Sequence, residues 1–238
     1  MTSPEFESRP QLSDGVARLA RRRIFDGTYA AGRYIRLDQL AVELGISVTP
    51  VREALFQLRA EGLLAQQPHR GFVVLPVTAR DLTDVANVQA YVGGELAARA
   101  AINIGEEQLR DLKEIQTQLE KAYAQRANDR AVRLNHEFHR IINIAADSPK
   151  LAQLMSQITR YASESVFPMI VGWPEQSTKH HRRLLAALEQ HDDKLARRTM
   201  SKHLTSAALS LTSHLAERGV LDGGVALPRT PPAADPPR

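Results

Sequence analysis

The 238-residue sequence contains no cysteine. Disulfide bonds, thiolate nucleophiles and cysteine-ligated metals are therefore excluded, and the composition suits a reducing compartment. No stretch approaches the roughly 18 apolar residues that cross a bilayer, and the first residues lack a basic flank followed by an apolar run. We therefore expect a cytoplasmic protein that makes no contact with a membrane.

A strong excess of charge of one sign is also missing. The 31 Lys and Arg residues nearly balance the 27 Asp and Glu residues, and the formal net charge of +4 is shared evenly between residues 1–76 and the rest. Binding to nucleic acid would therefore depend on a few side chains placed on one face, and not on a strongly basic chain. The length allows one large or two modest domains, each with its own core.

The first third of the chain has the pattern of three short amphipathic helices. Apolar residues recur at helical spacing over residues 12–26, 37–44 and 51–58, and a glycine follows each segment. Ser47 or Thr49 can cap the third helix, with a proline in its first turn.

Two extended runs, residues 63–67 and 72–75, follow the third helix. The loop between them contains a glycine, so the pair is typical of a hairpin. The order helix, helix, turn, helix, hairpin predicts a winged helix-turn-helix domain over residues 11–76, preceded by a flexible arm at residues 1–10.

This arrangement predicts binding to double-stranded DNA, because a helix fits the major groove and its N-terminal residues then meet base edges and phosphates. Ser47 and Thr49 offer hydroxyls and helix N-terminal amides to a phosphate. Arg52 faces away from the apolar stripe and can reach a guanine edge, while Arg70 at the hairpin tip can contact the DNA backbone or the minor groove. A solvent-facing arginine is usually only a surface residue, and small helical triplets also dock proteins, so it is the order of the elements that favours DNA.

Residues 31–74 resemble the winged-helix domain of GntR-type bacterial transcription regulators, particularly the FadR-like branch. The motifs that carry the resemblance are LGIS, TPVREAL and EGL. The resemblance implies DNA contacts at Ser47, Thr49, Arg52 and the wing residue Gly71, with Arg70 beside it. Val48 stands where the family usually has an arginine, which removes a charged contact to the operator.

The remainder of the chain, residues 77–218, predicts an antiparallel bundle of six or so helices. Thr78 and Asp81 have the spacing of a capping box at the start of the first helix, and Ser148 precedes a proline at the start of a helix that runs to about residue 170. The fold is thus expected to be mainly α. Residues 219–238 are rich in proline and are expected to form a disordered tail.

Three of the eight histidines fall on inward faces of the expected helices. His181 and His203 each lie 11 residues from Asp192, the turn between the last two helices. Both therefore reach the same level of an antiparallel pair, about 16 Å from the turn. His139 and Asn135 lie one turn apart on a third inward face. His136, His180 and His191 fall mainly on polar faces.

Three converging neutral imidazoles suit a divalent cation such as Zn²⁺ or Ni²⁺. The segment from about residue 80 to 215 resembles the FCD domain of the FadR-like branch, in which an Asp-x-x-Phe-His segment and two later histidines bind metal. The resemblance assigns metal binding to Asn135, His139, His181 and His203. Asn135 replaces the usual aspartate, so the site should hold a cation more weakly or rely on a carboxylate of the effector.

The usual arginine that anchors an organic-acid effector is also replaced, because Tyr91 stands at its position. Arg160, on another helix, could substitute for it. We take Tyr91 and Arg160 as candidate effector-binding residues.

These observations predict a homodimeric transcription regulator that binds a palindromic operator, with affinity controlled by a small molecule, an organic acid, bound near a metal. Two alternatives stay open. One is a metal-dependent helical enzyme whose winged helix docks a protein, although no nucleophile and base are positioned for catalysis. The other is a metal-free regulator in which the three histidines line a polar pocket.

Overall fold

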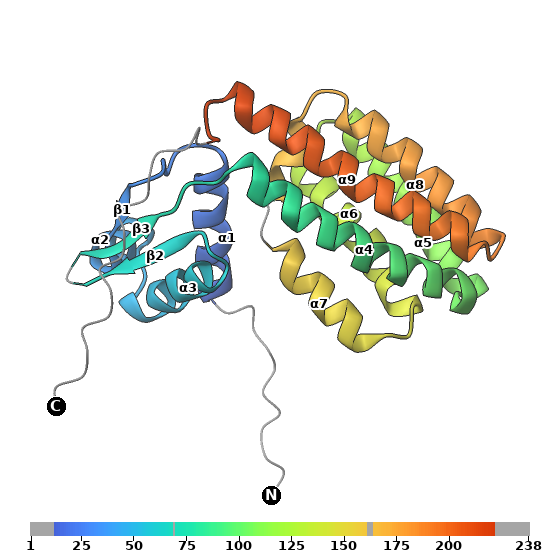
Figure 1. The fold of residues 1–238 in the computed structure, drawn as a ribbon, viewed down its shortest axis with the longest axis horizontal. Coiled ribbons are helices and arrows are strands. Elements are labelled where there is room, and N and C mark those ends of the chain that lie inside the picture. The colour runs from blue at the N-terminus through green and yellow to red at the C-terminus, as the bar shows by residue number, and fades with distance from the viewer. Residues whose placement is uncertain (1–11, 69, 161–163, 222–238) are drawn as a thin grey trace, which may run out of the picture.

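The computed structural model describes residues 12–68, 70–160 and 164–221. Two units lie side by side, a small unit with a three-stranded sheet and a larger unit of long helices (Figure 1). The mainly α fold expected from the sequence is confirmed.

The first unit contains three helices and three strands in the order that a winged helix-turn-helix requires. In chain order they are α1 (Leu12–Phe25), β1 (Tyr34–Ile35), α2 (Leu37–Leu44), α3 (Val48–Ala60), β2 (Leu64–Gln67) and β3 (Gly71–Val74). Gly45 ends α2 with a φ of 66°, a backbone conformation that glycine adopts readily.

The sheet is antiparallel, with strand order β1-β3-β2. The hairpin of β2 and β3 was predicted, and Leu64 pairs with Val74 in it. The two-residue strand β1 was not predicted, because Tyr34 and Ile35 alone are too short to show an alternating pattern. Ile35 pairs with Phe72 and closes the unit at the sheet edge.

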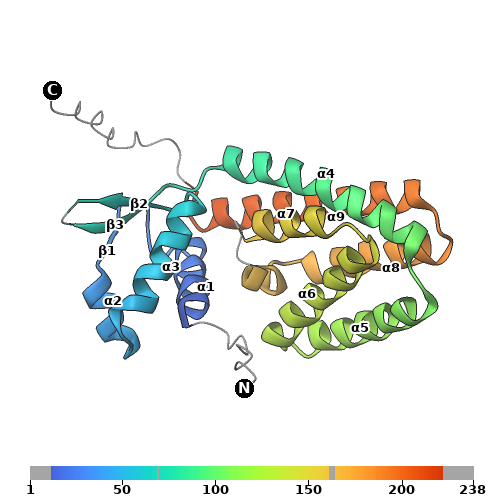
Figure 2. The ribbon, with the colours of Figure 1, turned by 90° about the horizontal axis from the view of Figure 1, so that it is seen from below.

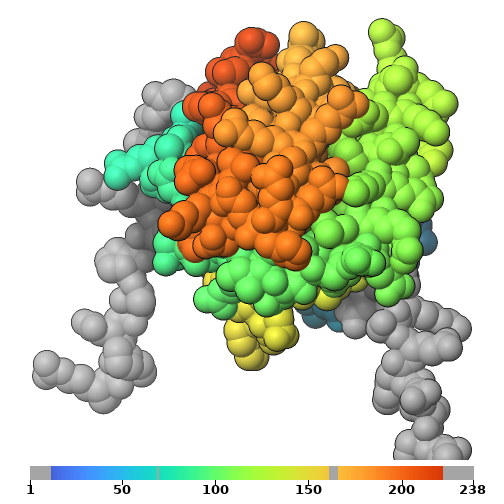
Figure 3. Space-filling view, turned by 90° about the vertical axis from the view of Figure 1, so that its right-hand side faces the viewer, coloured from blue at the N-terminus to red at the C-terminus, as the bar shows by residue number. Residues whose placement is uncertain are grey.

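The second unit is an antiparallel bundle. Its helices are α4 (Ala79–Asn103), α5 (Glu106–Ala124), α6 (Asn128–Ala145), α7 (Pro149–Thr159), the short 3₁₀ helix η1 (Glu164–Met169), α8 (Trp173–Glu189) and α9 (Asp193–Glu217). Seen from below, α5 and α6 lie on the opposite side of the bundle from α4 (Figure 2). The end of the bundle far from the first unit is covered by residues of α8 and α9 and of α5 (Figure 3).

The start of α4 follows the predicted capping box, and a side chain also caps the start of α9. The side chain of Thr78 accepts a hydrogen bond from the backbone N–H of Asp81, whose carboxylate accepts one from the backbone N–H of Thr78. Asp192 caps α9 by accepting from the backbone N–H of Leu195 at 2.9 Å. These caps fix where α4 and α9 begin.

The helix predicted from Ser148 to about residue 170 is wrong in its second half. The α-helix ends at Thr159, and residues 164–169 form η1. Pro168 excludes a regular α-helix through residues 164–170, because proline has no backbone N–H and its ring clashes with the preceding turn in the interior of an α-helix. Residues 161–163 lie outside the described part of the chain.

The long helices α4 and α9 pack closely along their lengths (Figure 1). Gly93 and Gly94 permit this approach, since a Cβ atom on Gly94 would lie 2.5 Å from Oγ of Ser201. The hydroxyl of Ser201 donates to the carbonyl of Ala90 at 2.7 Å. The two glycines therefore allow α4 and α9 to lie close together.

Apolar side chains form one large core and one small cluster inside the bundle, and a second large core that crosses between the units. The second core joins residues of α1, α3 and the sheet with Val166, Ile170 and Trp173 of the bundle and with Leu211 and Leu215 of α9. The bundle and the first unit are therefore held together by shared apolar packing as well as by the linker before α4.

The limits of the predicted units, 11–76 and 77–218, remain our proposed division. The predicted arm at residues 1–10 lies outside the described residues, as do residues 222–238 of the predicted tail. The start of the disordered tail at residue 219 is wrong, because Val220 and Leu221 pack against the apolar core that crosses between the units. Within the described residues, no helix has the length and apolarity to cross a bilayer.

Candidate functional site

Helix α3 presents one buried face and one exposed face. Val51, Ala54, Leu55 and Leu58 are fully buried against the first unit. Ser47, Thr49 and Arg52 are exposed at the other side of the same helix N-terminus. Ser47 is the N-cap residue, and its side chain makes no capping hydrogen bond, so its hydroxyl faces solvent.

A buried ion pair fixes the C-terminal end of α3 against α1. Nη2 of Arg21 lies 2.7 Å from Oε1 of Glu61, and Nε donates to Oε2 at 3.0 Å. Such two-point contacts between a guanidinium and a carboxylate hold geometry as well as charge. The exposed N-terminus of α3 is therefore carried on a rigid support.

The wing is the hairpin of β2 and β3, and Arg70 is exposed next to it. Gly71 has a φ of 93°, and a Cβ atom there would lie 2.6 Å from the carbonyl oxygen of Ile35. The backbone of the wing thus requires glycine at this position for its own packing. A contact between Gly71 and DNA remains a prediction.

His139, His181 and His203 lie together in the bundle and form what we call the histidine cluster. They come from α6, α8 and α9, and one ring nitrogen of each lies within 4.8 Å of the others. The ring centroids of His181 and His203 are 4.8 Å apart, and each lies 5.2 Å from that of His139. The convergence expected from the sequence is therefore present.

A side chain of α5 contacts the ring of His181 at the nitrogen that does not face the cluster. Its Nδ1 lies 2.8 Å from Oε1 of Gln116, and Nε2 of Gln116 donates to Oε1 of Glu120 at 2.9 Å. A carboxylate only accepts hydrogen bonds, so Glu120 fixes the amide with its oxygen toward His181. His181 therefore carries its proton on Nδ1 and presents the lone pair of Nε2 to the cluster.

The aromatic surroundings also set the position of the rings. Phe138 stacks on His181 with centroids 4.2 Å apart, and Trp173 lies 5.4 Å from His203. Among the described residues, the buried side-chain nitrogens that lack a hydrogen-bond partner are Nδ1 of His180, Nε2 of His181 and Nδ1 of His203. Unpaired buried polar atoms are rare in folded proteins, so their grouping marks a place for a ligand.

Burial keeps the cluster uncharged. It lowers the pKa of His139 to about 4, with a smaller effect from neighbouring His136. Burial and the neighbouring imidazoles lower the pKa of His181 and of His203 well below the usual value. Neutral imidazoles are the form that binds a metal ion, so the donor set fits a divalent cation.

Asn135 lies one turn before His139 on α6 and is half-buried. Its part in metal binding remains a prediction. Tyr91 is 71% exposed on α4, and Arg160 is exposed at the end of α7. Tyr91 and Arg160, the two candidate effector-binding residues, therefore face solvent, whereas the side chains of the histidine cluster are largely buried.

Sequence reasoning missed two side chains of the site. His180 was placed on a polar face, but its Nδ1 is buried and its ring lies 5.7 Å from that of His203. Gln116 was overlooked although a signal was present, because it interrupts an apolar stripe of Leu112 and Leu119 at helical spacing. A polar residue at a buried position generally has a specific partner.

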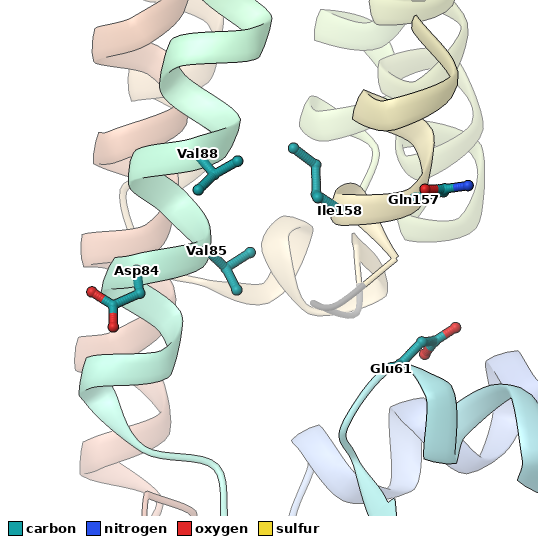
Figure 4. Close-up of a pocket in the computed structure, with 6 residues that line it drawn as sticks. All are labelled: Glu61, Asp84, Val85, Val88, Gln157 and Ile158. Atoms are coloured by element: carbon teal, nitrogen blue, oxygen red, sulfur yellow. The ribbon is translucent and has the colours of Figure 1, made fainter. Parts of the chain in front are cut away.

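A separate hollow of about 380 Å³ lies between the units and away from the three histidines. Val85 and Val88 of α4 and Ile158 of α7 point toward it, and Glu61 lies at its other side (Figure 4). Its walls are largely apolar. It lacks the converging polar atoms of the histidine cluster, which is therefore the better candidate site.

Comparison with known proteins gives two family matches that together span most of the chain. Residues 12–74 match bacterial regulatory proteins of the gntR family, and residues 84–206 match the FCD domain. The chain is 26% identical to the HTH-type transcriptional regulator YdhC of Bacillus subtilis, over 84% of this chain and 90% of YdhC. It is 25% identical to the HTH-type transcriptional repressor RspR of Escherichia coli, over 84% and 89%.

Among solved structures, McbR/YncC of E. coli has the same fold. The TM-score is 0.69 at 22% identity, and the match covers 90% of this chain and 99% of that one.

Proposed function

The chain belongs to the GntR family of bacterial regulatory proteins and carries an FCD domain, and we propose that occupancy of its histidine cluster controls its affinity for an operator. It is a DNA-binding transcriptional regulator. The matched family and the similar proteins are regulators and not enzymes, so the alternative of a metal-dependent enzyme is set aside.

We propose that α3 enters the major groove. The exposed Ser47 and Thr49 would contact phosphates, Arg52 would contact a base edge, and Arg70 and Gly71 of the wing would contact the adjacent backbone. One recognition helix reads only a few base pairs, so we further propose a homodimer on a palindromic site. We also propose a cytoplasmic location, which is where a bacterial regulator would meet DNA.

We propose that the cluster binds a divalent cation, with Zn²⁺ or Ni²⁺ the best fits to three imidazoles. Asn135, one turn from His139, is the proposed fourth protein ligand. The support is the donor chemistry: Gln116 orients Nε2 of His181, and no hydrogen bond occupies Nδ1 of His203. A bound cation would supply charge that fixes an anionic effector.

The charges around the cluster favour an anionic effector. Among the described residues, no Asp or Glu joins the three histidines, so a bound cation would keep its full charge in a buried place. Lys179, Lys202 and Arg183 add positive charge near His180. We therefore propose a small organic acid whose carboxylate contacts the metal, with His180 as a further contact.

The observation that carries this proposal is the position of η1. This short helix contacts α6, α8 and α9, the three helices that supply the histidines, and it also contacts α1 of the first unit. A ligand that moves the histidine-bearing helices would therefore act on α1 through direct packing. A coupling free energy of about 1 to 3 kcal/mol between ligand and operator is the usual range for such a link.

The experiment is a DNA titration followed by fluorescence anisotropy. A duplex is first selected from a random library by the full-length protein, and its dissociation constant is then measured at one fixed salt concentration, because salt alone changes affinity strongly. Zn²⁺-loaded protein is titrated with acetate, succinate and citrate. We expect at least one acid to change the dissociation constant by about 5-fold or more.

Two results would count against the proposal. Failure to select any duplex would contradict DNA binding, and a dissociation constant unaffected by the metal and by every acid would contradict control by the cluster. Metal analysis of the purified protein, with His181→Ala and His203→Ala as controls, separates this proposal from a metal-free regulator of the same fold.

A further inference from the structure

Trp173 is the only tryptophan in the chain. It is the first residue of α8, and only 4% of its surface is exposed. Its indole lies at the boundary between the histidine cluster and the packing that joins the two units. Phe138, which stacks on His181, belongs instead to the core inside the bundle.

On one side, Trp173 contacts the cluster directly. Its ring centroid lies 5.4 Å from that of His203, with an angle of 41° between the planes. No hydrogen bond holds Nδ1 of His203, so this nitrogen does not fix the orientation of the ring. A cation that binds His203 would set the orientation of the ring, and the indole is one of the aromatic neighbours that this ring contacts.

On the other side, Trp173 belongs to the apolar core that crosses between the units. This core includes Val16, Ala17 and Phe25 of α1 together with Leu211 and Leu215 of α9. The indole also packs against Phe167 of η1, with centroids 5.1 Å apart. The same side chain thus contacts a proposed metal ligand and the core on which the recognition helix rests.

Closely packed cores adopt discrete arrangements and do not deform continuously, so a shift of a large side chain is passed to its neighbours. We propose that Trp173 is the positioning residue that couples occupancy of the histidine cluster to the first unit. This inference rests on the proposed function. It adds the residue through which the coupling passes and predicts that metal binding and coupling can be separated by mutation.

The first test uses the intrinsic fluorescence of the full-length protein. Zn²⁺ is titrated into metal-free protein, and the emission of Trp173 is compared with the binding isotherm from calorimetry. Because the chain has one tryptophan, any change in emission reports on this position alone. We expect intensity or wavelength to change in proportion to calorimetric occupancy, and the change to be lost in His203→Ala.

The second test measures coupling in Trp173→Leu, with Trp173→Phe as the conservative variant and Ile102→Ala as the control at an exposed apolar position. For each protein we measure Zn²⁺ affinity and the ratio of operator dissociation constants with and without Zn²⁺. We expect Trp173→Leu to keep Zn²⁺ affinity within about 3-fold while the ratio falls to less than about 2-fold. Trp173→Phe retains part of the coupling, and Ile102→Ala behaves as the wild type.

The outcomes distinguish this inference from the function it rests on. If Zn²⁺ binds the wild type without changing its operator affinity, the proposed control and the inference both fail. If Zn²⁺ changes operator affinity equally in the wild type and in folded Trp173→Leu, only the inference fails. Unchanged tryptophan emission at saturating Zn²⁺ also contradicts the inference, whatever the variants do.

Discussion

Nδ1 of His181 lies 2.8 Å from Oε1 of Gln116, which fixes the imidazole with its lone pair toward the histidine cluster. If Gln116 orients His181 in this way, removing its amide should weaken metal binding. A glutamine that only packed in the core would not have this effect. Gln116→Leu keeps the volume of the side chain but removes the acceptor, so we expect Zn²⁺ affinity to fall by about 10- to 100-fold.

Calorimetric titration of metal-free protein checks this expectation. Gln118→Leu, on the same helix but with an exposed hydrogen bond to Glu114, serves as the control and should bind Zn²⁺ as the wild type does. Equal affinity in Gln116→Leu and the wild type would show that Gln116 does not orient a ligand.

Asn135→Asp tests the charge of the site. A carboxylate one turn from His139 would neutralise part of the charge of a bound cation, so we expect Zn²⁺ affinity to rise by about 10-fold. The variant should also bind Zn²⁺ with little dependence on added succinate, whereas binding to the wild type should strengthen when succinate is present. Unaltered Zn²⁺ affinity would place Asn135 outside the site.

Metal-free protein should lose stability as the pH falls. The pKa of His139 is lowered to about 4, and those of His181 and His203 are lowered well below the usual value. The unfolded chain therefore binds more protons than the folded chain below about pH 6.5, which makes unfolding more favourable as pH decreases toward 4.

For His139 alone we expect the free energy of unfolding to fall by about 1 to 2 kcal/mol between about pH 7 and pH 5. Urea denaturation in the presence of a chelator measures this. The dependence should weaken in a His139→Phe variant, and a flat profile in the wild type over this range would contradict neutral, buried imidazoles.

Arg52→Ala tests the proposed DNA contact. Arg52 is exposed on α3, and among the described residues it makes no ion pair or side-chain hydrogen bond, so its removal should leave the fold intact. We expect weaker binding to the selected duplex by about 10-fold or more, together with relaxed preference at one base position. Arg110→Ala, exposed on α5, is the matched control, and equal losses in both variants would indicate only a general effect of charge.

The fold could be predicted largely because local signals and global packing agree. The order of helices and hairpin in the first unit and the capping residues Thr78 and Asp192 are readable from short stretches of sequence. The meeting of His181 and His203 could also be predicted, since equal distances from a turn place two residues at one level of an antiparallel pair. Strand β1 and the 3₁₀ helix η1 could not be predicted. In the case of β1, Tyr34 and Ile35 pair only with Phe72 and Val73, which are distant in the sequence.

The missed parts of the site have a common physical cause. Helical periodicity indicates which face of a helix is buried. It does not indicate whether a neighbouring helix also covers residues at the edge between the buried and the exposed face. His180 lies at such an edge, where its Nδ1 is covered while its neighbours Lys179 and Arg183 on α8 are exposed. Trp173 could not be predicted as a residue of the site either, because its contacts with His203 and Phe167 join segments that only the tertiary structure brings together.

The most direct test of the account measures the operator dissociation constant of the wild type and of a variant with His139, His181 and His203 all replaced by alanine. Both proteins are titrated against the selected duplex at one salt concentration, with Zn²⁺ and with a chelator. We predict that Zn²⁺ changes the operator affinity of the wild type by about 5-fold or more and leaves that of the folded variant unchanged. A wild type that binds the duplex equally in both conditions, or a variant that still responds to Zn²⁺, would contradict it.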